Sequence, residues 1–147
     1  MMFAEFNGVL NWDGIWLDMN EASNFCNAEC GHSPTMDNFP YTPGGTDLNT
    51  KAIDLGAKHY NDMIEYDVHS LFGFMESRET SNFFKEILHQ RPFIISRSTF
   101  VTHGQHASHW LGDNFSNFDY LAWSIPGVFD FGMFGIPMVG ADICGFN

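Results

Sequence analysis

Short apolar runs alternate with longer polar or amphipathic segments along this chain. Each run has the length of a buried strand and passes into polar residues at its end. The runs cover residues 15–18, 93–97, 110–113 and 136–140. Because parallel strands need a long crossover between them, this alternation predicts parallel strand–helix–strand units of an α/β fold.

Two of the longer segments predict helices. Residues 68–88 place apolar side chains at mostly helical spacing, and we expect this amphipathic helix to break or bend near Gly73 or Thr80. Residues 117–134 predict a second helix, which Pro126 interrupts.

The spacing of the strand ends fits a barrel. A barrel of about 250 residues has eight strand–helix units of about 30 residues each, and the separation of Asp113 and Asp142 is close to the length of one unit. The stretch between Arg97 and Asp113 is too short for a crossover helix, so we expect an irregular connection there. Residues 20–50 form a polar loop rich in proline and glycine, and a loop of this length usually covers a functional site.

Fewer strands are predicted than a closed barrel needs. A (β/α)8 barrel has eight strands, whereas this chain of 147 residues contains only the runs named above. We therefore expect part of a barrel, with exposed parallel strand edges that are unstable on their own.

Composition narrows the classes of partner. With 18 acidic and 6 basic residues the formal net charge is −12, which argues against binding to nucleic acid or to an anionic membrane surface. No stretch approaches the length and apolarity of a membrane span. The 16 phenylalanines and 4 tryptophans predict a packed core and aromatic walls around a ligand.

Carboxylates follow several of the predicted strands, at Asp18, Asp113 and Asp142. Catalytic residues of α/β barrels stand at the carboxyl ends of strands, and retaining cleavage of a glycosidic bond uses two carboxylates about 5–5.5 Å apart. We expect Asp18 and Asp113 to form this pair on neighbouring strand tips. Asp18 would face Arg97 as the ionised nucleophile, and Asp113 would lie in an apolar setting beside Trp110 as the acid.

Each of these residue types also has a purely structural interpretation. An aspartate after a strand often caps a helix or forms a turn, and Arg97 fits a structural ion pair equally well. The aromatic residues Trp16, Trp110 and Phe146 are either sugar-stacking platforms or part of the core.

The cysteines and histidines leave further alternatives open. Cys26 and Cys30 lie in one polar loop and form either a small disulfide or two free thiols, and they are too few for a zinc site. Three histidines at every third position, His103, His106 and His109, suggest either metal ligands or a solvated loop with one structural histidine.

Several motifs together resemble glycoside hydrolase family 31. Its nucleophile signature is similar to WLDMNE at residues 16–21, and its acid/base segment is similar to SRSTF at 96–100 followed by HWLGDN at 109–114. A further family motif resembles GADICGF at 140–146. The resemblance covers nearly the whole chain and is closest to the α-glucosidase members, although residues 101–106 depart from the expected serine- and glycine-rich sequence.

This resemblance implies a (β/α)8 barrel and a retaining, double-displacement mechanism, with Asp18 as nucleophile and Asp113 as acid/base. It implies no metal and no organic cofactor. Cys26 and Cys30 resemble the disulfide-bearing loop of plant and lysosomal-type members, which favours a secretory, lysosomal, vacuolar or extracellular setting. The residues that it places in the substrate pocket are Arg97, Trp16, Met19, Trp110, Asp142 and Phe146.

The resulting expectation is a partial catalytic domain over residues 1–147, corresponding to barrel strands four to seven with the long loop after strand four. We expect a truncated gene product, a partial gene model or an excised piece of an enzyme that releases terminal α-linked glucose from maltooligosaccharides, with the rest of the barrel and its β-sandwich domains outside the chain. By itself the chain is expected to be inactive. The alternatives are α-xylosidase, transglucosylase or glycoprotein-trimming activity, or a non-catalytic carbohydrate-binding fragment.

Overall fold

The computed structural model of the chain describes residues 2–147, apart from the side chains of Met2 and Pro43. It divides into two compact units. Unit 1 combines Met1–Asn20 with Gly73–Asn147, and unit 2 is Glu21–Phe72.

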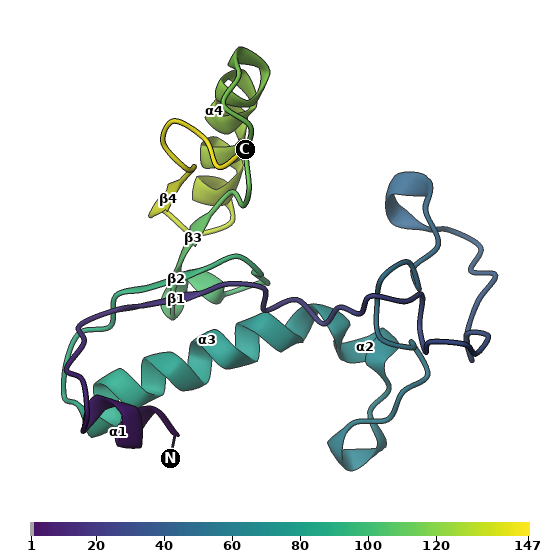
Figure 1. The fold of residues 1–147 in the computed structure, drawn as a ribbon, viewed down its shortest axis with the longest axis horizontal. Coiled ribbons are helices and arrows are strands. Elements are labelled where there is room, and N and C mark those ends of the chain that lie inside the picture. The colour runs from purple at the N-terminus through teal and green to yellow at the C-terminus, as the bar shows by residue number, and fades with distance from the viewer. Residues whose placement is uncertain (1) are drawn as a thin grey trace. The chain divides into compact units, whose positions relative to one another are not determined.

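Unit 1 is built on a parallel sheet (Figure 1). Its strands, within the described residues, are β1 (Ile15–Leu17), β2 (Ile94–Ser96), β3 (Ser108–Trp110) and β4 (Val139–Gly140). They are hydrogen-bonded in the order β1-β2-β3-β4, and each neighbouring pair is parallel. The predicted parallel α/β sheet is confirmed, and it is consistent with part of an α/β barrel, whose repeating unit is a strand followed by a helix.

Helices connect and cover these strands. Those of unit 1 are α1 (Met2–Asn7), α3 (Phe72–Asn82), a π-helix (Phe83–Ile87), a 3₁₀ helix (His103–Gln105) and α4 (Phe118–Met133). The helix α3 runs along β1 and β2 in Figure 1, and the π-helix that continues it contributes Phe84 to a core cluster with Leu17 and Ile94. Burying one such side chain stabilises the fold by about 1.5–3 kcal/mol, so this layer fixes the positions of β1 and β2.

Side chains alternate between the two faces of the sheet. Leu17 of β1 and Ile94 of β2 belong to the core cluster. Trp16, which directly precedes Leu17 and pairs with Ile95, is instead 57% exposed. Because successive residues of a strand face opposite sides, the face that carries Trp16 and Ile95 is the one that α3 does not cover.

The helix predictions agree with the structure in extent. Residues 68–87 are helical, and the helix type changes at His69, Phe72 and Phe83. The last two changes lie close to Gly73 and Thr80, the alternative positions predicted for a break. The helix over 117–134 is observed as α4, and Pro126 lies inside it without ending it. The short helix α1 was not predicted.

Two strand predictions were wrong in their limits. The strand predicted at 110–113 is β3, which ends at Trp110, because the chain turns at Gly112 with a φ of +79°. The strand predicted at 136–140 is reduced to β4, and Pro137 at its predicted start cannot donate a hydrogen bond to a ladder. The irregular connection between Arg97 and Asp113 is confirmed.

Unit 2 takes up nearly all of the loop predicted over residues 20–50 and continues to Phe72, with little regular structure. Its elements are 3₁₀ helices at Pro43–Gly45, Tyr60–Asp62 and His69–Leu71 and the single turn α2 (Glu65–Val68). A disulfide joins Cys26 to Cys30, which decides between the two alternatives for these cysteines. The carboxylate of Glu65 is 1% exposed and lies within hydrogen-bond distance of His59 and His69.

No helix within the described residues is both long and apolar enough to span a bilayer.

Candidate active site

The ends of the four strands carry the charged residues that the sequence singled out. Asp18 directly follows β1 and Arg97 directly follows β2, while Asp113 and Asp142 come shortly after β3 and β4. Because the strands are parallel, their carboxyl ends meet at the same edge of the sheet. This edge is where an α/β barrel builds its active site.

Asp18 and Asp113 are not on neighbouring strands, so that expectation was wrong. Strand β2, which ends at Arg97, pairs with β1 on one side and with β3 on the other. Two strand spacings amount to about 10 Å. The two carboxylates can therefore come closer than this only if their side chains and the loops after the strands lean toward each other. Arg97 therefore lies between the two acids in strand order.

The contacts of Asp18 orient its carboxylate. Its Oδ1 lies 3.3 Å from Nη1 of Arg97 and accepts a hydrogen bond of 2.7 Å from the backbone N–H of Met19. Met19 itself has a φ of 53°, an uncommon conformation for a residue with a side chain, and such conformations gather at functional sites. The predicted pairing of Asp18 with Arg97 is confirmed.

A cavity of about 500 Å³ brings together three of the predicted substrate-binding residues, Trp16, Trp110 and Asp142. The two indole rings meet edge to face with centroids 5.0 Å apart. Trp16 is largely exposed, whereas Trp110 is 6% exposed and its Nε1 has no hydrogen-bond partner within the described residues. Trp16 is thus free to stack on a ligand in this structure, while Trp110 mainly packs against it.

Other predicted site residues lie outside this cavity. Met19 and Phe146 are exposed, and neither lines it. Asp113 is also exposed, so the apolar setting that we expected around it is absent from the part of the chain that the structure describes.

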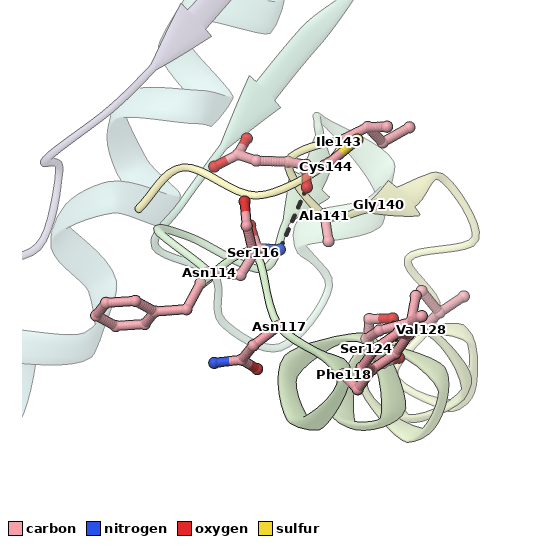
Figure 2. Close-up of a pocket in the computed structure, with 13 residues that line it drawn as sticks. Asn114, Ser116, Asn117, Phe118, Ser124, Val128, Gly140, Ala141, Ile143 and Cys144 are labelled. Carbon is pink, nitrogen blue, oxygen red and sulfur yellow. Dashed lines mark hydrogen bonds between the residues drawn. The ribbon is translucent and has the colours of Figure 1, made fainter.

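A second cavity, of about 720 Å³, lies between the loop after β3, α4 and the loop after β4 (Figure 2). Of the predicted site residues only Asp142 lines it, and α4 contributes Phe118, Leu121 and Val128. Asn114, Ser116, Asn117 and Ser124 give this second cavity polar groups as well. What favours the cavity at Trp16 as a sugar site is therefore its pair of indole rings, on which a sugar can stack.

Asn114 joins the two loops beside that second cavity. Its Nδ2 donates a 3.2 Å hydrogen bond to the backbone O of Asp142, and its own backbone O accepts from the N–H of Phe146. The loops after β3 and β4 are therefore tied to each other.

The histidine segment is largely a solvent-exposed loop, as one alternative had it, except that two of its histidines, His103 and His109, are buried and not one. His103 is fully buried, and burial, followed by the nearby His109 and His106, lowers its pKa to about 4. Burial also lowers the pKa of His106. Within the described residues, no group of three or more His, Cys, Asp or Glu has the arrangement of a metal site.

Sequence reasoning missed a set of buried polar residues next to the charged ones. Asn20, Ser96 and Ser98 hydrogen-bond to one another at the ends of β1 and β2, and Asn20 and Ser96 are 4% and 0% exposed. The sequence did contain a signal for them: each lies within two positions of a charged residue that follows a predicted strand.

A family model described as the glycosyl hydrolases family 31 TIM-barrel domain matches residues 1–147. The chain belongs to this family. The match confirms the resemblance inferred from the motifs at residues 16–21, 96–100, 109–114 and 140–146.

Known proteins similar to the chain agree with this assignment. A probable alpha-glucosidase of Oryza sativa subsp. japonica is 44% identical over 148 residues, which cover 98% of this chain and 16% of the rice protein. Alpha-xylosidase 1 of Arabidopsis thaliana is 40% identical over 169 residues, covering 96% of this chain and 18% of that protein.

A solved structure of an ER glucosidase II heterodimeric complex has a TM-score of 0.72 and 28% identity, covering 97% of this chain and 14% of that one. The chain thus spans less than a fifth of the length of each relative.

Proposed function

We propose that this chain is the segment of a retaining α-glucosidase that carries both catalytic carboxylates, acting on terminal non-reducing α-linked glucose of maltooligosaccharides. One observation supports this most directly: Asp18, Arg97, Asp113 and Asp142 follow consecutive parallel strands at one edge of the sheet. Family membership and the 44% identity to the rice protein add to it.

In the proposed first step, an Asp18 oxygen attacks the anomeric carbon of the sugar. The bond from that carbon to the glycosidic oxygen breaks, and Asp113 transfers its proton to the departing oxygen. The product is a glucosyl ester of Asp18. In the second step Asp113 takes a proton from water, the water oxygen bonds to the anomeric carbon, and the ester bond to Asp18 breaks, so the configuration is retained.

The remaining predicted residues bind the sugar in this proposal. Trp16 offers an exposed indole face in the cavity that Asp142 also lines, and a carboxylate accepts hydrogen bonds from sugar hydroxyls. Arg97 orients Asp18 through the 3.3 Å ion pair. Met19, Trp110 and Phe146 complete the pocket, and neither a metal nor an organic cofactor takes part.

We place residues 1–147 in barrel strands four to seven of a larger catalytic domain, with further barrel strands and β-sandwich domains completing the enzyme. Four parallel strands cannot surround a sugar, so we expect no measurable hydrolysis from these 147 residues alone. We also propose a secretory setting, lysosomal, vacuolar or extracellular, because the Cys26–Cys30 disulfide is typical of oxidising compartments. The similarity to an ER glucosidase II points the same way.

A chimera tests the proposal. Residues 1–147 replace the matching segment of the rice alpha-glucosidase, and the chimera is incubated with 5-fluoro-glucosyl fluoride, which slows breakdown of the glucosyl ester. We expect mass spectrometry to find the label on Asp18. In a separate measurement with a hydrolysable substrate, the first product should be α-glucose and not β-glucose. Label on another residue, or no label in a folded chimera, would refute the assignment of Asp18.

Two variants of the chimera separate the roles of the acids. Asp18→Ala should abolish hydrolysis of every substrate. Asp113→Ala should retain the first step with an aryl glucoside whose leaving group needs no proton, and added azide should then speed turnover by attacking the glucosyl ester. The configuration of the glucosyl azide decides the roles: azide attack on the glucosyl ester gives the α product and direct attack on the substrate gives the β product, so an α product from Asp18→Ala and a β product from Asp113→Ala would mean that the two roles are reversed.

The Arabidopsis relative supports one alternative, that the substrate sugar is xylose. Placing the same 147 residues in the Arabidopsis alpha-xylosidase tests it. If this segment selects glucose, both chimeras will prefer aryl α-glucosides to aryl α-xylosides. A preference for xylosides in both would favour the alternative, and inactive but folded chimeras with retained sugar binding would favour a non-catalytic fragment.

A further inference from the structure

A chain of buried hydrogen bonds joins the ends of β1, β2 and β3. Its members are Asn20, Ser96 and His109, which are 4%, 0% and 8% exposed. Ser96 pairs with Leu17 of β1 on one side and with His109 of β3 on the other. The hydrogen bonds therefore run across the sheet at the position where these strands end.

Three hydrogen bonds close a ring between β1 and β2. Asn20 Nδ2 donates to Ser96 Oγ at 2.8 Å, Ser96 Oγ donates to the backbone O of Ser98 at 2.8 Å, and the backbone N–H of Ser98 donates to Asn20 Oδ1 at 3.0 Å. Each side-chain atom in the ring therefore has a partner whose role is fixed, and the loop after β1 is locked to the loop after β2.

His109 extends the chain to β3. Its Nδ1 lies 2.9 Å from the backbone O of Ser96, and since a carbonyl oxygen can only accept, Nδ1 carries the proton. The imidazole also packs against Phe131 of α4, with ring centroids 3.9 Å apart. The hydrogen bond to Ser96 and the contact with Phe131 thus hold β3 beside β2 on the face of the sheet against which α4 packs.

Close packing of α3 confines the ring from the other side. A Cβ on Gly73 would lie 2.8 Å from the backbone O of Asn20 and 2.5 Å from Cβ of Ser98, so only glycine fits there without a shift. Neither Asn20 nor Ser96 lines the cavity at Trp16. These two residues therefore act on the site through its neighbours and not by touching a ligand.

Each of these three residues lies within two sequence positions of a residue of the proposed site. Asn20 follows Asp18 by two positions, Ser96 directly precedes Arg97, and His109 directly precedes Trp110. Strands β1, β2 and β3 are 3 residues long, so backbone ladders alone hold their ends weakly. The chain of hydrogen bonds supplies the missing lateral connection.

We infer that Asn20 and Ser96 are positioning residues that set the distance and angle between the nucleophile Asp18 and Arg97. His109, which also lines the cavity at Trp16, ties the strand that carries Asp113 to them. This inference rests on the proposed glycosidase function. Reacting groups lose about 100-fold in rate when a distant change moves them by about 1 Å, so the network governs the chemical step and not sugar binding.

The test compares Asn20→Ala, Ser96→Ala and the double variant in the rice chimera. Each single variant should lower kcat by about 10-fold to 100-fold, with KM changing by less than about 3-fold, because orientation is lost while sugar contacts remain. The double variant should lose little more than the worse single variant, since both changes break the same hydrogen bond. Ser96→Thr keeps a hydroxyl and should recover most of kcat.

Matched controls are available elsewhere in the chain. Ser77 on α3 is equally buried, and its Oγ has no hydrogen-bond partner within the described residues, so Ser77→Ala removes a buried hydroxyl without breaking the network. Asn49 in unit 2 is also fully buried and donates to the backbone O of Met36, so Asn49→Ala removes a buried asparagine that reaches no strand end. Both should keep kcat within about 2-fold, the ordinary effect of a change away from the site.

The outcomes are distinguishable. A kcat within about 2-fold of the unaltered chimera in both single variants, or additive losses in the double variant, would overturn the positioning role while leaving the proposed function intact if Asp18→Ala is inactive. An active Asp18→Ala variant would instead refute the proposed function. Should Asn20→Ala fail to fold, the pair Ser96→Ala and Ser96→Thr decides the matter: equal kcat in the two variants, with equal rates of Asp18 labelling by 5-fluoro-glucosyl fluoride, contradicts the inference.

Discussion

The guanidinium of Arg97 lies 3.3 Å from the carboxylate of Asp18 and links the ends of two neighbouring parallel strands. The same strand order places Arg97 between the two acids proposed to share the chemistry. A cation in this position affects the orientation of the nucleophile more than it affects the stability of the fold, because both side chains are partly exposed: 29% for Arg97 and 44% for Asp18.

Replacing Arg97 should therefore separate activity from stability. In the rice chimera we expect Arg97→Ala to lower kcat/KM by about 100-fold, and Arg97→Lys to recover part of it because a point charge keeps the attraction but loses the fork geometry. The free energy of unfolding should change by less than about 1 kcal/mol, as is usual for an exposed ion pair. Steady-state kinetics and thermal unfolding of the same samples measure both quantities.

A matched variant controls for the loss of an arginine. Arg78 on α3 forms a surface ion pair of 2.7 Å with Glu79, away from the strand ends. Arg78→Ala should leave kcat/KM unchanged. Equal kinetic losses in Arg78→Ala and Arg97→Ala would show that Arg97 has no special relation to Asp18.

His103 predicts an acid-sensitive fold. Its pKa is lowered to about 4 in the folded chain, so between pH 6.5 and 4 the unfolded chain binds a proton that the folded chain does not. The free energy of unfolding is therefore highest above pH 6.5 and falls as the pH decreases, by a total of about 3 kcal/mol for this residue. His106, whose pKa is also lowered, adds to the loss with the same sign.

Urea unfolding followed by tryptophan fluorescence measures this effect. His103→Leu removes the titrating group, so the drop in unfolding free energy between pH 7 and pH 4.5 should be smaller by about 2 kcal/mol. His89, which is exposed, provides the control: His89→Leu should keep the full drop. An identical pH dependence in His103→Leu and the unaltered chain would rule out His103 as its source.

The Cys26–Cys30 disulfide predicts redox sensitivity confined to unit 2. Closing so short a loop stabilises the folded state by about 2 kcal/mol on the chain-entropy argument. A reducing agent should therefore speed proteolytic cleavage within residues 21–72, and the double variant Cys26→Ser with Cys30→Ser should be cleaved at the faster rate without it.

Cys144 separates this effect from general thiol chemistry. It is an exposed free cysteine outside unit 2, so Cys144→Ser should be cleaved like the unaltered chain and should retain its response to reduction. Faster cleavage outside residues 21–72 on reduction would contradict a local role for the disulfide.

Glu65 predicts a second stabilising element in unit 2. Its buried carboxylate lies 2.6 Å from Nε2 of His59 and 2.9 Å from Nδ1 of His69. Glu65→Ala removes the acceptor of both imidazoles, and since these are 31% and 39% exposed and can turn to water, the cost is that of the lost hydrogen bonds, about 0.5–1.5 kcal/mol each. Glu65→Gln keeps one acceptor and should cost less.

Hydrogen exchange measures the loss where it occurs. The backbone N–H groups of Glu65 and Tyr66 donate to the carbonyls of Ala57 and Leu55, so both amides should exchange faster in Glu65→Ala. Glu29 is exposed, and Glu29→Ala should leave these amides protected. Unchanged protection in Glu65→Ala would mean that the two histidines do not hold this segment.

Local patterns were enough to predict most elements and the chemistry at their ends. The apolar run that ends at Asp18 is β1 with its acid, and the helical spacing over 117–134 is α4 despite Pro126. These predictions succeed because the period of burial and the acid that follows a strand are properties of neighbouring residues. The motifs at residues 16–21, 96–100, 109–114 and 140–146 together were also sufficient to indicate the family.

Lateral order and burial were not available from such patterns. The placement of β2 between β1 and β3, which separates Asp18 from Asp113 by a strand, depends on hydrogen bonds between residues far apart in the chain. So does the burial of His103, which its polar neighbours in sequence do not indicate. The ring formed by Asn20 and Ser96 exists only because two strand ends meet, and no single stretch of sequence contains both partners.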